Sequence, residues 1–80
     1  MSENSFSWEN KIVAITGGGN GIGLAIALAA KDKGAQISIS DINETDLTKA
    51  KENHGFQTCL SDAGKEKDIL NFINNTKDNL

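Results

Sequence analysis

The chain is 80 residues long, 38% of its residues are hydrophobic and eight are glycines, a composition typical of a folded globular chain. It carries eight basic and eleven acidic residues for a net charge of −3, and no basic patch indicates nucleic-acid binding. Cys59 is the only cysteine and His54 the only histidine, which excludes an internal disulfide and a cysteine-based zinc site.

The first strand and helix are separated by a cluster of glycines. We interpret residues 1–10 as an extension that precedes the folded part. Ile12 to Thr16 form a short apolar run of mainly β-branched residues, which is typical of a strand buried on both faces of a parallel sheet. Five glycines lie between Gly17 and Gly23, and residues 24–30 favour a helix that ends at Gly34. The pattern predicts a strand, a glycine-rich turn and a helix.

A second strand and helix follow directly. Alternating serines and isoleucines over residues 37–40 predict a strand that ends at Asp41. Asn43 and Asp46 are spaced as an N-cap and its N3 partner, and Gly55 is placed to end the helix. The residues predicted to share one face of this helix are Leu47, Ala50 and His54.

A third pair completes the pattern. Residues 56–60 predict a strand, and a helix is expected to begin near Gly64. The residues at helical spacing on one face are Ile69, Phe72, Ile73, Thr76 and Leu80. The βαβαβα order predicts that residues 11–80 form half of a Rossmann-type, doubly wound α/β fold. Its parallel strands are expected in the order 3-2-1, in a three-layer arrangement.

The glycine-rich turn, residues 16–23, is the feature that carries chemistry. Its glycines are spaced Gly17-x-x-x-Gly21-x-Gly23 rather than G-x-G-x-x-G. The physical requirements are the same: a sharp turn off the strand, close approach of the backbone to a pyrophosphate, and close packing of helix on sheet. The following helix directs its N-terminal N–H groups at that phosphate. The turn therefore favours a nucleotide site; the alternative is a glycine-rich turn that binds nothing.

Asp41 ends the second strand, where a carboxylate can accept hydrogen bonds from both adenosine ribose hydroxyls. The same charge repels the 2′-phosphate of NADP, so NAD is favoured. The sequence contains no arginine to attract that phosphate, and Asn20 stands at a loop position where one could do so. The alternative is that Asp41 caps the following helix, a role that Asn43 could also fill.

Asp62 ends the third strand and, with Ala63, is expected to border an adenine pocket, because ligands gather at the carboxyl ends of parallel strands. Its carboxylate could accept the adenine amino proton. Asp62 could equally cap the third helix or interact with the dipole of that helix.

These motifs resemble those of the short-chain dehydrogenases/reductases over residues 11–80. Residues 16–23 look like the TGxxxGIG cofactor loop, and Asp41-Ile42-Asn43 like the NAD-selecting strand end. Asp62-Ala63 is similar to an Asp-Val adenine contact, with Ala63 a departure that shortens one pocket wall. The resemblance implies NAD as the cofactor and NADP as disfavoured, with Ile22 near the pyrophosphate and nicotinamide. The residues implied to hold NAD are Gly17, Gly19, Asn20, Gly21, Ile22, Gly23, Asp41, Ile42, Asp62 and Ala63.

The catalytic residues of that family have no counterpart in this sequence. The resemblance implies a fourth strand with an Asn-Asn-Ala-Gly motif, then a serine and a Tyr-x-x-x-Lys pair, and Leu80 precedes all of them. Residues 74–77 lack the following Ala-Gly, and the sequence contains no tyrosine, so we assign no catalytic residue. We expect a truncated NAD-binding portion of an oxidoreductase that, when complete, transfers hydride between nicotinamide and an alcohol or carbonyl.

Truncation would leave one edge of the first strand open. Residues 12–15 would then present unpaired backbone groups without a charge or proline to block pairing. We therefore expect self-association or pairing with a full-length relative through this strand. The alternative function is a non-catalytic interaction protein.

The remaining features indicate structural roles. His54 is expected at the C-terminal end of its helix dipole, Cys59 as a small packed hydrophobe, and Trp8 and Phe6 over the sheet edge. The longest apolar run, residues 21–30, is shorter than the roughly 20 residues that a membrane span requires. Because the N-terminus also lacks a signal-peptide pattern, we expect a cytoplasmic protein without membrane contact.

Overall fold

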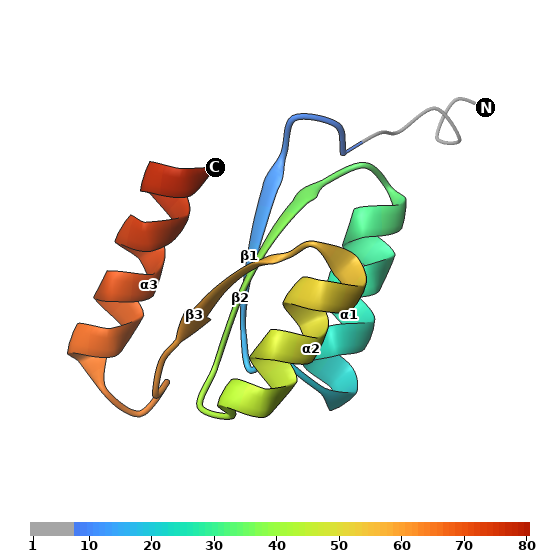
Figure 1. Ribbon diagram of the computed structural model, residues 1–80. Coiled ribbons are helices and arrows are strands. Elements are labelled where there is room, and N and C mark those ends of the chain that lie inside the picture. The colour runs from blue at the N-terminus through green and yellow to red at the C-terminus, as the bar shows by residue number, and fades with distance from the viewer. Residues whose placement is uncertain (1–7) are drawn as a thin grey trace.

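Three strands and three helices alternate along the chain in the computed structural model, which describes residues 8–80 (Figure 1). The elements are β1 (Ile12–Thr16), α1 (Gly21–Asp32), β2 (Gln36–Asp41), α2 (Glu44–His54), β3 (Gln57–Leu60) and α3 (Glu66–Asn79). The predicted βαβαβα order is confirmed. Within the described residues, none of the helices combines the length and apolar character needed to cross a bilayer.

The strands form one parallel sheet with β2 at its centre. The order is β1-β2-β3, with Ile12 of β1 aligned with Gln36 of β2, and Ser38 of β2 aligned with Gln57 of β3. Helices α1 and α2 lie on one face and α3 on the other (Figure 1), so the molecule has three layers. The predicted Rossmann-type half with strand order 3-2-1 is confirmed. Because the strands are parallel, the loops after β1, β2 and β3 all lie at one edge of the sheet.

The main apolar core lies between the sheet and the pair α1 and α2. Its buried residues are Ala27, Ala30, Ala35, Ile37, Ile39, Leu47, Ala50 and Phe56. The alanines of α1 allow this helix to approach the sheet closely. Trp8 packs against the same core, and its backbone N–H donates to the Lys33 carbonyl at 3.1 Å, whereas Phe6 lies outside the described residues.

The α3 layer is held by hydrogen bonds as well as by apolar packing. Phe72 and Thr76 are the buried residues of this helix. The hydroxyls of Ser38 and Thr76 form a buried hydrogen bond of 2.6 Å, and Gln57 Nε2 donates to Asn75 Oδ1 at 3.0 Å. The buried face is narrower than predicted, because Ile73 and Leu80 remain exposed.

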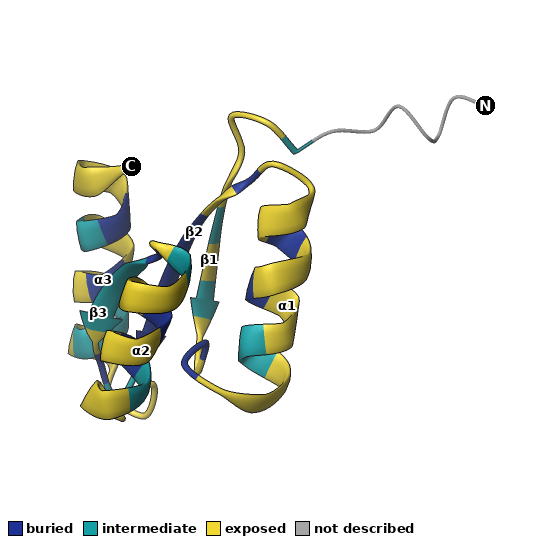
Figure 2. Cartoon of the chain, turned by 45° about the vertical axis from the view of Figure 1, so that its right-hand side comes forward, coloured by how far each residue is buried: buried dark blue, intermediate teal, exposed yellow. Residues whose placement is uncertain are grey.

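The burial of β1 differs from its prediction. Val13 and Ile15 are half-buried against the core, but Ile12 is 45% exposed, and Ala14 and Thr16 are exposed as well. Figure 2 shows β1 in the colours of half-buried and exposed residues. The prediction of burial on both faces is wrong: α1 covers one face of β1, while α3 packs against β3 and β2 and leaves the other face bare.

The helix ends follow their predicted signals in part. Asn43 Oδ1 accepts a hydrogen bond from the Asp46 N–H at 3.0 Å, and Gly55 ends α2 in the left-handed region with φ of 72°. Helix α3 begins at Glu66 rather than near Gly64. The reason is a turn in which Asp62 Oδ1 accepts from the Gly64 N–H at 2.8 Å before the helix starts.

Candidate functional site

The loops at the carboxyl edge of the sheet bring the glycine-rich turn against the ends of β2 and β3. The Gly18 N–H donates to the Ser40 carbonyl at 3.0 Å, and the Gly19 N–H donates to Asp41 Oδ2 at 3.0 Å. The Ser61 N–H donates to the Asp41 carbonyl, also at 3.0 Å. Residues from three separate segments therefore meet around Asp41.

The glycine spacing has a direct structural basis. Gly17 and Gly21 have φ angles of 69° and 57°, a region that other residues enter with strain. A Cβ added at either position would meet no atom within 4 Å, so both border open space. A Cβ at Gly23 would overlap the carbonyl oxygen of Gly17, which shows how closely α1 passes the turn. The sharp turn off β1 and the close packing of α1 behind it occur together, as the glycine spacing predicts.

Gly18 is a close-packing position that the motif did not identify. A Cβ there would lie 2.6 Å from Ile39 Cγ2, so the turn packs directly on the central strand. The spacing Gly17-x-x-x-Gly21 requires no glycine at this position. The signal that could have found it is the run of three consecutive glycines beside a strand with bulky β-branched residues.

Helix α1 supplies no negative charge and no side-chain cap to its own N-terminus. Asn20 occupies its N-cap position but makes no side-chain capping bond, and the first turn contains no acidic residue. The first turns of the other two helices each carry two acidic residues, Glu44 and Asp46 in α2 and Glu66 and Asp68 in α3. Unpaired N–H groups at a helix start attract an anion, so α1 presents the electrostatics that a phosphate requires.

Asp41 is half-buried and held by backbone N–H groups from both sides. Its Oδ2 atom accepts from Gly19 and its Oδ1 atom accepts from Asn43 at 3.1 Å. Asn43, and not Asp41, caps α2. Each carboxylate oxygen can accept more than one hydrogen bond, so this arrangement orients the group without using up its acceptors.

The Asp62 region is organised by a turn rather than by a helix cap. Asp62 Oδ1 accepts from Gly64, and the Asp62 N–H donates to Asp68 Oδ2 at 3.0 Å, while Lys65 occupies the N-cap position of α3. Ala63 is exposed beside it. The buried Ser61 hydroxyl has no partner among the described residues, and sequence reasoning missed it because a serine at a strand end carries no distinctive signal.

Two exposed isoleucines and one amide complete the predicted set. Ile22 is 82% exposed at the start of α1, and Ile42 is 69% exposed just after β2. The Asn20 side chain turns toward α2 and donates from Nδ2 to Asp46 Oδ2 at 2.5 Å. All ten predicted residues thus lie in or next to the loops of the carboxyl edge.

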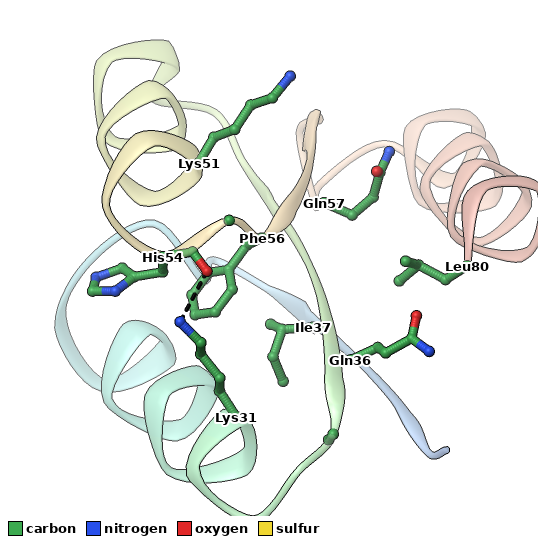
Figure 3. A pocket seen from close by; sticks show the side chains of 10 residues that line it. Lys31, Gln36, Ile37, Lys51, His54, Phe56, Gln57 and Leu80 are labelled. Carbon is green, nitrogen blue, oxygen red and sulfur yellow. Dashed lines mark hydrogen bonds between the residues drawn. The ribbon is translucent and has the colours of Figure 1, made fainter. Parts of the chain in front are cut away.

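A separate cavity of about 430 Å³ lies at the opposite end of the sheet and contains none of these residues. Figure 3 shows the Lys31 ammonium reaching the backbone of His54 beside the Phe56 ring, whereas Lys51 points away. Lys31 Nζ donates to the His54 carbonyl at 3.0 Å, and the His54 and Phe56 rings stack with centroids 5.2 Å apart. His54 thus joins the ends of α1 and α2 structurally.

Cys59 has the environment of an inert thiol. Its side chain is half-buried in β3. Burial raises the pKa of the Cys59 thiol, and the nearby Asp68 carboxylate raises it further. A protonated thiol is a poor nucleophile. Within residues 8–80, no group of three or more His, Cys, Asp or Glu side chains is arranged to hold a metal ion.

Comparison with known proteins agrees with this geometry. A family model described as short chain dehydrogenase matches residues 11–80. The chain belongs to the short-chain dehydrogenase family. The dehydrogenase/reductase SDR family member 6 of Rattus norvegicus is 38% identical over 64 residues, which are 80% of this chain and 26% of that relative. This short-chain dehydrogenase chain therefore spans about a quarter of the length of the rat protein.

Two solved structures share the fold of this chain. A hydroxysteroid dehydrogenase from Escherichia coli superposes with a TM-score of 0.84 and 25% identity, over 90% of this chain and 32% of that one. A 3-ketoacyl-(acyl-carrier-protein) reductase from Brucella melitensis, solved in complex with NADH, gives a TM-score of 0.83 at 24% identity, over 90% and 31%. The short-chain dehydrogenase fold of the described residues is thus shown.

Proposed function

We propose that this chain binds NAD at the carboxyl edge of its sheet, as the nucleotide-binding portion of a short-chain dehydrogenase. The observation that carries the proposal is the glycine turn in front of the uncapped N-terminus of α1. In this turn Gly17 and Gly21 border open space, and the Gly19 N–H donates to the Asp41 carboxylate at the end of β2. Family membership supports the same assignment.

The residues of the glycine turn fit a dinucleotide. Gly17 and Gly21 leave room where the backbone would meet a pyrophosphate, and Gly23 keeps the helix close behind it. Gly19 and Asn20 form the rest of the cradle, and Ile22 supplies exposed apolar surface toward the nicotinamide side. When bound, NAD supplies the hydride acceptor; this chain binds and orients it.

The adenosine end of NAD would lie between the ends of β2 and β3. Asp41 would accept hydrogen bonds from the ribose hydroxyls, and its charge favours NAD over NADP. Ile42, 69% exposed, would offer apolar surface to the adenine ring, and Asp62 with Ala63 would border the same end of the nucleotide. The Ser61 hydroxyl at the same strand end is a buried group that still needs a partner.

For the whole protein we propose hydride transfer between nicotinamide and an alcohol or a carbonyl, an activity that membership of the family supports. Residues 11–80 would contribute the cofactor side of that reaction. A lone cysteine fits a reducing compartment, so we place the protein in the cytoplasm.

An amide NMR titration of the 80-residue chain with NAD, and separately with NADP, tests the proposal. We expect NAD to shift the signals of residues 17–23 and of Asp41, with NADP binding more weakly. Asp41→Asn should weaken NAD binding about tenfold, because a charge-assisted hydrogen bond is lost. Asp32→Asn, at the far end of α1, is the matched control and should have no effect. A dispersed spectrum that NAD leaves unchanged would refute the proposal.

A second candidate function is association through β1. This strand is at an edge of the described sheet, and Ile12 is 45% exposed there, which favours pairing with a strand of another copy or of a full-length relative. Sedimentation velocity over a range of concentrations should reveal dimers, and Ile12→Lys should reduce them. A monomer at every concentration would exclude self-association.

A further inference from the structure

A closed ring of hydrogen bonds joins the glycine turn to the loop after β2. Gly19 donates to Asp41, which accepts in turn from the Asn43 N–H. Asn43 accepts from the Asp46 N–H, and Asp46 Oδ2 accepts from the side chain of Asn20, the neighbour of Gly19. The ring therefore begins and ends at two consecutive residues of the turn.

The ring explains why Asn43 and Asp46, the predicted N-cap and its N3 partner, form only half of a capping box, the reciprocal pair of hydrogen bonds between two such residues. In a complete box, the Asp46 carboxylate would reach back to the Asn43 N–H. Here that N–H donates to Asp41 at 3.1 Å, and the Asp46 carboxylate turns instead to Asn20 Nδ2 at 2.5 Å. The half-buried Asp46 side chain is thus directed toward the glycine turn rather than into its own helix.

Two carboxylate side chains consequently flank Gly19. A Cβ built on Gly19 would lie 2.8 Å from Asp41 Oδ2 and 3.0 Å from Asp46 Cβ. A cavity of about 260 Å³ between α1 and α2 is lined by Asp46 and also by Lys49 and His54. Glu44 adds a further negative charge in the same helical turn, so the surroundings of Asp41 are acidic.

We propose that Asp46 is a second specificity-determining residue for the dinucleotide: it disfavours a 2′-phosphate and is held beside the glycine turn by Asn20. This inference rests on the nucleotide site proposed above, with the adenosine ribose at Asp41. A phosphate on that ribose would meet the charge of Asp46 as well as that of Asp41. The ribose hydroxyls of NAD carry no charge and do not incur this repulsion.

The test separates the charge of Asp46 from its hydrogen bond. Asp46→Asn removes the charge and retains an oxygen that can accept from Asn20, whereas Asn20→Ala removes the hydrogen bond and retains the charge. Glu52→Gln removes a charge from an exposed position near the other end of α2 and serves as the matched control. Dissociation constants of the 80-residue chain for 5′-AMP and for 2′,5′-ADP are measured by amide NMR.

We expect the wild-type chain to bind 5′-AMP more tightly than 2′,5′-ADP. The quantity compared is the ratio of the dissociation constant for 2′,5′-ADP to that for 5′-AMP. Asp46→Asn should lower this ratio roughly three- to tenfold, the effect of one screened charge near the protein surface. Asn20→Ala should narrow it less, because Asp46 keeps its charge but loses its support, and Glu52→Gln should leave it within twofold.

The outcomes are distinct. An unchanged ratio in Asp46→Asn, or an equal change in Glu52→Gln, overturns the role of Asp46 while the nucleotide site stands. If Asn20→Ala leaves both the ratio and the Gly19 amide signal unchanged, Asn20 does not hold Asp46 and the inference fails in that part. If a folded chain binds neither nucleotide, the proposed function fails and the inference fails with it.

Discussion

At the scale of single residues, the glycines of the turn serve different physical purposes. Gly21 has a left-handed backbone and open space around it, while Gly23 has a backbone oxygen where its Cβ would be. A substitution at Gly21 therefore strains one residue, and a substitution at Gly23 forces the helix away from the turn.

Gly23→Ala should therefore destabilise the chain far more than Gly21→Ala. We expect losses of about 3 kcal/mol in the free energy of unfolding for Gly23→Ala, against about 1 kcal/mol for Gly21→Ala. Urea denaturation followed by circular dichroism measures both. Equal losses would show that the clash at Gly23 relaxes easily.

The raised pKa of Cys59 predicts slow reaction with alkylating agents. The thiolate is the reactive form, so the pH midpoint of alkylation in the folded chain should lie above that of a free cysteine. Asp68→Asn should lower this midpoint but not abolish the shift, because burial is the larger cause. Because the pKa of the Cys59 thiol is higher in the folded chain than in the unfolded chain, its contribution to the free energy of unfolding is lost as pH rises above the cysteine pKa of the unfolded chain. A midpoint equal to that of a free cysteine would contradict the assignment.

Site residues that belong to a sequence motif were predictable, whereas side-chain contacts between residues far apart in the chain were not. Gly17, Gly21 and Asp41 follow from spacing and strand ends, because the turn chemistry is local. The bond from Asn20 to Asp46 joins residues 26 positions apart, and it depends on how α1 and α2 lie together. No local pattern in the sequence carries that information.

At the scale of elements, α3 depends on a single buried hydroxyl pair for part of its attachment. Ser38 and Thr76 are 38 residues apart and nearly inaccessible, at 0% and 6% exposure. Each hydroxyl satisfies the other in a place that water does not reach. Removing one of them leaves the second without a partner.

Thr76→Val should therefore lower the free energy of unfolding by about 1–3 kcal/mol. The double variant Ser38→Ala with Thr76→Val should recover part of this loss, because neither polar group then remains unpaired. Thr48→Val removes an exposed hydroxyl that bonds only to its own helix and should change stability little. Strictly additive losses in the double variant would count against the pairing.

The order and type of the elements were predictable because each strand and helix carries its own periodicity and stop signals. The burial of β1 was not, since it depends on which neighbours cover that strand rather than on its apolar sequence. The start of α3 at Glu66 was missed for a local reason: Asp62 and Gly64 form a turn that competes with the helix.

At the scale of the whole molecule, a chain of this size has a small core and should be marginally stable. Binding of NAD should therefore have a large effect on thermal unfolding. At a hundredfold excess over the dissociation constant, a ligand adds about 2.7 kcal/mol. We expect Tm to rise by roughly 10–20 °C.

Differential scanning fluorimetry with NAD measures this shift, and NADP at the same concentration provides the comparison. Asp41→Asn, which we expect to bind NAD about tenfold more weakly, should lose about half of the shift produced by NAD. The same Tm with and without NAD would contradict nucleotide binding by the folded chain.

The acidic first turns of α2 and α3 also affect how a nucleotide arrives. Because all three helices run in the same direction, Glu44, Asp46, Glu66 and Asp68 gather with Asp41 and Asp62 at the edge that receives the anion. The phosphates are attracted locally by α1, but these six carboxylates outnumber Lys65 and Lys67 at the start of α3, so the approaching ligand first meets net negative charge. Added salt screens that field, so the association rate constant of NAD should increase with ionic strength, the reverse of the usual trend for a nucleotide and its protein.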